Sequence, residues 1–423
     1  MHKEIFKTLL INVIAGFMVI WMAASCSKHG PHPGPQPGPI DIKLGAILDL
    51  TGNYSEEGLA GKAAIGIAIS DLNGRYASVN SPVRFSCVYA DTHMDTVMTL
   101  IRAKEMFSQG IRLLAGGPGN STELKSIRSF VDENQVLALT CFSSSPSLAI
   151  PGDFIFRLIT DDNVQGQALI RMMQYDSIKA LVPVWREDTY GTGLYQTVKE
   201  RFQTVGGTVY NGVSYLADET NFTELIQQAA VDVSSAIATY GASKVGVILI
   251  SYQEASEFLK AAAQVPDLAL VKWYGCDANV QKSSVTGDPD AAQFAYFTRF
   301  IAPIMAIGTA ESLPLPAQVI SMRIKEITGK EPDAYALSAY DAVMIYGLCY
   351  DLVKRYDPMA IKSVLPSVCA SYNYMGISRT LNAAGDLATA NYIFWRVTGD
   401  GAGWTWDSYC TWFADGDYIQ VRR

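Results

Sequence analysis

Short apolar runs alternate with amphipathic stretches along most of the chain. Residues 42–48 form a continuous apolar run that predicts a buried strand, whereas residues 58–73 carry apolar side chains at the spacing of a helix. The alternation continues through 83–89 (strand), 96–109 (helix), 112–115 (strand), 123–133 (helix), 136–140 (strand), 180–184 (strand), 194–205 (helix), 208–215 (strand), 223–234 (helix), 244–250 (strand), 254–264 (helix) and 271–274 (strand). Continuous apolar strands separated by helices indicate an α/β fold whose parallel sheets are covered on both faces. The pattern pauses near 157–162 and is too long for one sheet, so we expect two sheets.

The first forty residues follow a different pattern. Lys3 and Lys7 precede an apolar run over 8–22, which is followed by small residues and Cys26. Such a segment is typical of a secretory signal peptide and is short for a membrane span. We expect residues 1–25 to be removed and Cys26 to be lipidated, because the segment resembles the signal peptides of bacterial lipoproteins. Ala23 departs from that pattern, which more often has Leu there, and ordinary secretion with an incidental cysteine is the alternative.

Residues 26–40 after the predicted cleavage site are rich in Gly, Pro and His. Proline removes a backbone donor and fixes φ, and glycine adds conformational freedom, so the segment predicts a short stalk. Acyl chains on Cys26 would hold the protein on a bilayer, because each buried methylene contributes about 0.8 kcal/mol. We therefore expect a periplasmic protein that is lipid-anchored to a bacterial membrane.

Composition narrows the range of functions. Hydrophobic residues make up 49% of the chain and charged residues 17%, which is typical of a globular protein with a well-filled core. The net charge of −8 argues against nucleic acid as a partner. His93 is the one histidine in the predicted folded part, and no metal-ligand spacing is present, so we expect no metal, no cofactor and no enzymatic activity. An exported serine hydrolase is disfavoured because it needs an acid and a histidine beside its nucleophile.

Six further cysteines follow Cys26 at spacings that form no evident disulfide framework. Export permits disulfides, and Cys349–Cys369 is one candidate bridge. Free buried cysteines are the alternative, since unpaired cysteine packs well in protein cores.

Small and polar residues gather in the loops that follow the predicted strands. These loops are 49–57, 116–122, 141–145, 185–191, 251–254 and 275–279. In open α/β sheets, ligands bind beyond the carboxyl ends of the strands. Hydroxyls, backbone amides, aromatic rings and acids would meet there, which fits a small polar molecule that carries its own charges.

Motifs in these loops and in the adjoining strands and helices occur in a recognisable order. They are IKLGAILDLTG, AGGPGNS, FSSSPSL, DTYGTG, NFTELI, SYQEA, YGCDA, YALSAYDAV and LNAAGDLATANYIFWRV. From Ile42 to about Val397 the chain resembles the leucine/isoleucine/valine-binding proteins, which are type I periplasmic solute-binding proteins of amino-acid transporters. The resemblance implies two doubly wound parallel-sheet lobes joined by three crossover strands, near 157–162, 300–304 and 376–381. Lobe one would comprise 41–162 and 302–375, and lobe two would comprise 163–301 and 376–423.

The resemblance also implies ligand contacts in lobe one. Ser121 would hold the α-group of an amino acid at a helix start, where free N–H groups favour an anion. A helix N-cap is the alternative role of Ser121. Counting on from Ser121 places the next contacts at Phe142 and Ser144, with Ser143 and Ser145 as alternatives if the register slips by one. The Phe142 ring would narrow the pocket or stack on the ligand, unless it belongs to the core.

In lobe two the resemblance implies contacts from Tyr190, Tyr252 and Asp277. The two tyrosines would close over the ligand, each offering an apolar ring and a polar tip. Asp277 would pair with the ligand's ammonium, because a buried charge is tolerated only when it is paired. An aspartate in a turn or at an N-cap is the alternative for Asp277.

Specificity for the ligand's side chain is expected from Tyr54, Glu57 and Trp185, with Arg186 nearby. The charges of Glu57 and Arg186 leave room for a polar or charged side chain, and solvated loop charges are the alternative. These features together predict a lipid-anchored protein that captures an amino acid or similar small polar ligand between two closing lobes. It would deliver the ligand to the permease of an ABC-type transporter. The alternative is a ligand-sensing domain that signals to a membrane partner without transport.

Overall fold

The computed structural model describes residues 38–309, 312–400 and 403–422. The expected signal peptide and the lipidated Cys26 lie outside the described residues. The compact unit considered below is Ile40–Arg423.

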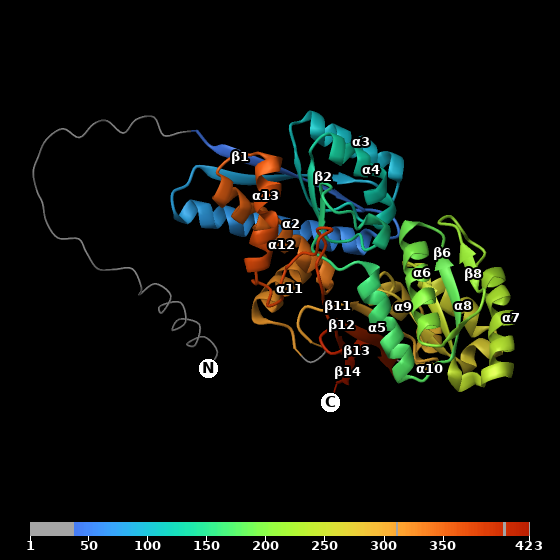
Figure 1. Cartoon of the computed structure of the whole chain (residues 1–423). Coiled ribbons are helices and arrows are strands. Elements are labelled where there is room, and N and C mark those ends of the chain that lie inside the picture. Colours follow the sequence, from blue (N-terminus) through green and yellow to red (C-terminus); the bar gives the residue numbers. More distant parts are fainter. Residues whose placement is uncertain (1–37, 310–311, 401–402, 423) are drawn as a thin grey trace, which may run out of the picture. The chain divides into compact units, whose positions relative to one another are not determined.

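A five-stranded parallel sheet, in the order β2-β1-β3-β4-β5, forms the centre of what we term the first lobe. Its strands are β1 (Ile40–Leu48), β2 (Val83–Asp91), β3 (Leu113–Gly116), β4 (Leu137–Thr140) and β5 (Ile155–Arg157). The helices of this lobe are α2 (Ser55–Ser78), α3 (Thr96–Ser108), α4 (Ser121–Glu133), α11 (Leu315–Thr328), α12 (Ala334–Val353) and α13 (Pro358–Ser371), with the short 3₁₀ helix η1 (Pro146–Leu148). Figure 1 shows α11 and α12, in orange, beside the blue helix α2, which is far from them in sequence, and α13 packs on α12.

Helix α12 is the most apolar helix in the described part of the chain that is long enough to cross a membrane. Its composition alone would allow this, but 72% of the apolar stretch is buried inside the protein. The helix packs against α2 and α13, so it is a core helix of the first lobe.

A nine-stranded sheet forms the centre of the second lobe, in the order β14-β13-β12-β11-β10-β9-β6-β7, with β8 also paired to β6. Its strands are β6 (Ala180–Arg186), β7 (Thr208–Val209), β8 (Val213–Tyr215), β9 (Val245–Ile250), β10 (Lys272–Tyr274), β11 (Ile301–Met305), β12 (Tyr392–Gly399), β13 (Trp404–Phe413) and β14 (Tyr418–Val421). Its helices are α5 (Asp162–Tyr175), α6 (Thr189–Thr204), α7 (Phe222–Tyr240), α8 (Ala255–Ala263), α9 (Ser283–Gly287) and α10 (Pro289–Phe297), with the 3₁₀ helices η2 (Ala242–Lys244) and η3 (Pro266–Leu270). The strands from β6 to β11 pair in parallel, and β12 to β14 add an antiparallel edge.

Two details differ from the expectations. The single strand expected over 208–215 is two strands, β7 and β8, because Gly212 interrupts it with φ of 64°. A side chain at Gly212 would lie 1.9 Å from the carbonyl oxygen of Pro183, so the bend requires glycine. The return crossing expected near 300–304 falls within β11, which pairs with β10 and β12, so the chain leaves this sheet only after Met305. A buried apolar run looks the same whether it crosses between lobes or pairs in a sheet.

Two fully buried arginines fasten the segments that run between the lobes. Arg157 forms a bidentate ion pair with Asp386, at 2.5 and 2.7 Å, and donates to the carbonyl oxygens of Ser143 and Ser145. Arg379 pairs with Asp341 at 2.7 and 2.9 Å. Both of these Arg379 bonds end on Oδ2 of Asp341, whereas the planar, bidentate pair of Arg157 with Asp386 fixes direction as well as distance. Arg157 holds the loop after β4 in place through Ser143 and Ser145, and Arg379 donates to the carbonyl oxygen of Leu158, next to the expected crossings at 157–162 and 376–381.

The six cysteines of the described residues are free, so the candidate bridge Cys349–Cys369 is wrong. Both thiols are buried in the apolar core, and burial raises the pKa of each to about 12. Sequence spacing carried no information on this point, because buried free cysteine behaves as a small apolar side chain.

Candidate functional site

The expected ligand residues meet where the two lobes face each other. Loops after β1, β3 and β4 of the first lobe lie against loops after β6, β9 and β10 of the second. Buried members of this interlobe cluster are Tyr54, Ser121, Ser144, Tyr190, Tyr252 and Asp277. The parallel strands explain the convergence, because their carboxyl ends share one edge of each sheet.

Asp277 is the centre of the interlobe cluster. Its carboxylate accepts a hydrogen bond from the hydroxyl of Tyr190, at 2.5 Å, and a second from the hydroxyl of Tyr335. Its backbone N–H donates to Gln165 Oε1 at 3.0 Å. Burial raises the pKa of Asp277, and the hydrogen bonds from the two tyrosines and Gln165 act in the opposite direction. Among the described residues, Asp277 forms no ion pair, so this buried acid lacks a cation.

Tyr335 and Gln165 were not predicted from the sequence. Tyr335 lies in the first turn of α12, whose N-cap Asp333 accepts from the N–H of Ala336. It comes from the first lobe and Asp277 comes from the second, so the hydrogen bond between them joins the lobes. The motif YALSAYDAV contained Tyr335 but offered no reason to single out one of its two tyrosines.

Three tyrosines form a continuous aromatic wall beside Asp277. The rings of Tyr54 and Tyr252 meet edge to face with centroids 5.2 Å apart, and those of Tyr252 and Tyr190 are 5.5 Å apart. Such contacts are favourable geometries for aromatic pairs. Since Tyr54 belongs to the first lobe and the others to the second, the wall spans the interface.

The serine loops supply hydroxyls and backbone groups from the first lobe. Asn120, not Ser121, caps α4, accepting from the N–H groups of Thr122 and Glu123 at 3.0 Å each. The Oγ of Ser121 instead accepts from the N–H of Ser145 at 3.1 Å. The N-cap alternative for Ser121 is therefore excluded, and its hydroxyl lies inside the interlobe cluster.

Ser145 and Thr122 reach across to the start of α6 in the second lobe. The hydroxyl of Ser145 donates to the carbonyl oxygen of Thr189 at 3.0 Å, and the N–H of Thr189 donates to Thr122 Oγ1 at 3.2 Å. These bonds make the lobes touch directly, which describes a closed arrangement. Ser143 lies away from this contact and donates to the carbonyl oxygen of Pro118 at 3.4 Å.

Phe142 and Ser144 take different roles within one loop. A side chain added at Gly61 of α2 would lie 2.8 Å from Phe142 Cζ, so the ring packs tightly on that helix inside the first lobe. Ser144 faces the crossing, where its carbonyl oxygen accepts from the N–H of Asp162 at 2.8 Å.

The expected side-chain pocket is formed only in part. Glu57 forms a buried ion pair with Lys282 of the second lobe, and the Lys282 ammonium lies 5.3 Å from the centre of the Tyr54 ring. Lys282 was missed because nothing in its local sequence distinguishes it from a surface lysine. Trp185 stacks on Tyr195 at 3.9 Å instead of facing Tyr54.

Arg186 lies on the opposite face of β6 from Trp185, as strand alternation requires. It pairs with Asp188 at 2.9 Å and Glu254 at 3.0 Å, and its guanidinium lies 5.0 Å from the centre of the Tyr252 ring. Asp188 and Glu254 therefore neutralise the charge of Arg186, and the Arg186 guanidinium helps to position the Tyr252 ring.

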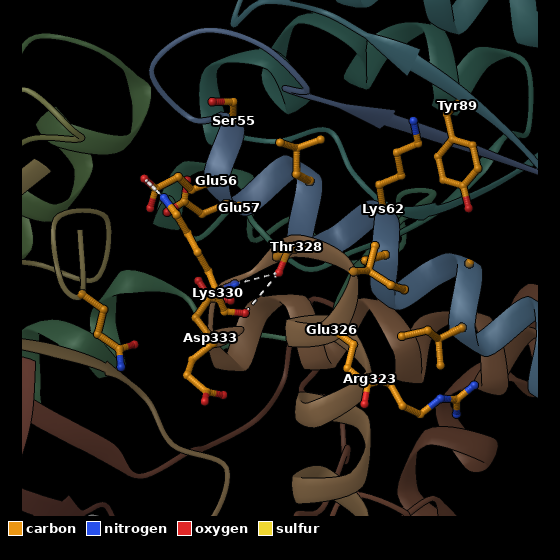
Figure 2. Close-up of a pocket in the computed structure, with 18 of the residues that line it drawn as sticks. Ser55, Glu56, Glu57, Lys62, Tyr89, Arg323, Glu326, Thr328, Lys330 and Asp333 are labelled. Atoms are coloured by element: carbon orange, nitrogen blue, oxygen red, sulfur yellow. Dashed lines mark hydrogen bonds and ion pairs between the residues drawn. The ribbon is translucent and has the colours of Figure 1, made fainter. Parts of the chain in front are cut away.

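A groove of about 1050 Å³ adjoins the interlobe cluster (Figure 2). It follows α2 and α11 and shares Glu57 and Asp333 with the neighbourhood of Tyr54. At this end, Lys330 pairs with Glu56, which also accepts from the hydroxyl of Ser283 in the second lobe. Within the described part of the chain, no group of three or more His, Cys, Asp or Glu side chains could hold a metal ion.

The chain matches the model of a known protein family. A family model described as the receptor family ligand binding region matches residues 60–391. The chain belongs to this family. Because the family is one of ligand-binding regions, the chain is a binding protein and not an enzyme, as expected from its composition.

Solved structures share the fold. The leucine binding protein LivK of Thermotoga maritima matches with a TM-score of 0.70 and 18% identity, over 89% of this chain and 99% of LivK. LivJ of Streptococcus pneumoniae, solved in complex with isoleucine, matches with a TM-score of 0.68 and 15% identity, over 87% of this chain and 99% of LivJ. The two-lobed type I periplasmic-binding-protein fold is thereby confirmed.

Two further kinds of protein are similar to this chain in sequence. The uncharacterized protein MJ1266 of Methanocaldococcus jannaschii is 25% identical over 409 residues, which are 91% of this chain and 94% of MJ1266. Glutamate receptor 2.1 of Arabidopsis thaliana is 23% identical over 166 residues, which are 39% of this chain and 18% of that receptor.

Proposed function

We propose that this protein captures an amino acid or a similar small polar ligand between its two lobes and delivers it to an ABC-type transporter. The observation that carries the proposal is Asp277, a buried carboxylate that accepts from tyrosines of both lobes and has no cation among the described residues. A buried carboxylate of this kind is complementary to a ligand ammonium. LivK and LivJ, named for leucine and branched-chain amino acids, share the fold and support the ligand class.

The surrounding groups match the remaining parts of an amino acid. The Ser121 hydroxyl and backbone groups of the loop at Ser144 can bind a ligand carboxylate or α-amino group. Tyr54 and Tyr252 offer apolar ring surface for a side chain. Because these groups come from both lobes, only the closed form makes all the contacts, and the ligand shifts the population toward closure.

The anchoring part of the proposal concerns Cys26 and the stalk over 26–40. A lipid on Cys26 would keep the binding lobes near a membrane permease while the stalk leaves them free to open and close. A Cys26→Ala variant tests this point, because it should move the protein from the membrane fraction to the soluble periplasmic fraction.

A thermal-shift panel of amino acids and related amines tests ligand capture directly. A ligand present at about 100 times its dissociation constant stabilises the folded protein by about 2.7 kcal/mol, which is readily measured. We expect at least one amine-bearing ligand to raise the melting temperature. A panel without any shift would contradict the proposed function.

Sensing without transport is the second candidate function, favoured by the description of the family as receptors and by the partial match to a plant glutamate receptor. The two functions differ in the partner. Ligand-dependent stimulation of a reconstituted permease ATPase supports transport, whereas ligand-dependent binding to a membrane signalling protein supports sensing.

A further inference from the structure

Asp162 is a buried acid at the crossing between the lobes whose partners are incomplete. It is the first residue of α5, and its side chain is fully buried. Its Oδ1 accepts from Gln165 Nε2 at 2.9 Å, while its Oδ2 makes no hydrogen bond within the described residues. An unpartnered carboxylate oxygen in such a place needs a donor or a cation, because burial without a partner is costly.

Asp162 and Asp277 lie on either side of one glutamine. The Nε2 of Gln165 donates to Asp162, and its Oε1 accepts from the backbone N–H of Asp277 at 3.0 Å. Burial and the nearby Asp277 raise the pKa of Asp162 well above its usual range, while the Ser144 hydroxyl acts in the opposite direction. Burial and Asp277 therefore both favour the protonated, uncharged form of Asp162.

The charged groups that face Asp162 do not neutralise it. Asp161 and Asp277 add negative charge, and the nearby cation Arg157 already forms a bidentate pair with Asp386. The other groups around Asp162 are the tyrosine hydroxyls of Tyr190, Tyr335 and Tyr392, which remain uncharged.

Two other buried cations near the interlobe cluster already form ion pairs within the protein. Lys282 pairs with Glu57, and Arg186 pairs with Asp188 and Glu254. In the described part of the chain, Asp162 and Asp277 are thus two neighbouring buried carboxylates without a cation. A ligand that brings a single ammonium can compensate only one of them.

We propose that Asp162 is a second anionic binding group beside Asp277, so that the site selects small ligands with two positive groups. This inference rests on the proposed function and narrows its ligand class to basic amino acids and diamines. The second ammonium or guanidinium takes the free Oδ2 of Asp162 as its acceptor. A cation beside Asp162 favours the ionised form of its carboxyl group, so the proton that leaves Asp162 goes to the solvent and binding of the second positive group releases protons.

Calorimetry on the full chain at pH 7, with L-lysine, putrescine and L-leucine as probes, tests the inference. We expect L-lysine or putrescine to bind at least tenfold more tightly than L-leucine. Asp162→Asn should remove this preference while L-leucine binds no more weakly than to the wild type. The matched control is Asp95→Asn, which removes a charge from the exposed N-cap of α3 in the first lobe and should keep the preference.

Proton release gives a second readout that needs no variant. Titrations in two buffers with different protonation enthalpies should show proton release with L-lysine and less release with L-leucine. Equal or tighter binding of L-leucine by the wild type, or lysine binding without proton release, would overturn the inference while leaving the proposed function intact. Failure of all three probes together with a flat thermal-shift panel would overturn both.

Discussion

The ion pair between Glu57 and Lys282 predicts that one lysine controls how firmly the lobes close. The two side chains are 7% and 4% exposed and come from different lobes. Lys282→Met leaves Glu57 buried and unpaired in the closed form, and breaking such a pair costs about 3–5 kcal/mol. In the open form Glu57 returns to water, so the cost falls mainly on closure. A cost of about 3 kcal/mol lowers the closing equilibrium roughly 100-fold, since every 1.4 kcal/mol is tenfold.

Small-angle scattering and ligand calorimetry measure this effect. Lys282→Met should enlarge the radius of gyration of the ligand-free protein and weaken binding of whichever ligand the thermal-shift panel identifies by up to about 100-fold. The matched control is Lys330→Met, whose pair with Glu56 is 52% and 25% exposed and should contribute less than about 1 kcal/mol. The double variant Glu57→Gln with Lys282→Met should recover much of the affinity. The reasoning is refuted if Lys282→Met binds ligand within twofold of the wild type.

Two further predictions concern hydroxyl and carboxyl groups of the first lobe. Tyr335→Phe removes one donor from Asp277, and since hydrogen bonds to charged groups contribute about 1.5–3 kcal/mol, affinity measured by calorimetry should fall about tenfold or more. Tyr340→Phe on the same helix, whose hydroxyl bonds Asp71, should leave affinity unchanged. Burial and Asp49 raise the pKa of Glu123 above the usual 4.5, so the folded protein holds this proton more tightly than the unfolded chain does. The free energy of unfolding should therefore fall as the pH rises from about 4.5 to about 9. Glu123→Gln should flatten this dependence in urea titrations at several pH values, and an unchanged slope would contradict the assignment.

The lobed α/β fold follows from the sequence for a clear physical reason. Strands buried on both faces are continuously apolar, and β9 (Val245–Ile250) and β4 (Leu137–Thr140) show this without interruption. The antiparallel strands β12 to β14 at the edge of the second sheet could not be predicted from this pattern, because these half-exposed strands mix apolar and polar residues. The bend at Gly212 depends on contact with Pro183, which no local pattern reveals.

Some residues of the site could likewise be expected from the sequence, whereas others could not. Asp277, Tyr190 and Tyr252 were expected from the resemblance to the leucine/isoleucine/valine-binding proteins, and each follows a strand at the edge where ligands bind in such sheets. Trp185 and Arg186 are adjacent on one strand, so they point to opposite faces, and the sequence does not say which face meets the other lobe. Asp162 and Lys282 gain their importance from neighbours more than a hundred residues away, through tertiary contacts that spacing along the chain does not encode.

Calorimetry on an Asp277→Asn variant tests the central claim most directly. The substitution keeps the size of the side chain and removes a buried charge that contacts tyrosines of both lobes. With a ligand that shifts the melting temperature of the wild type, we expect affinity to fall more than tenfold, because a buried ammonium loses its partner. Asp290→Asn, at an exposed position of α10, should bind as the wild type does. Unchanged affinity in Asp277→Asn would contradict the account.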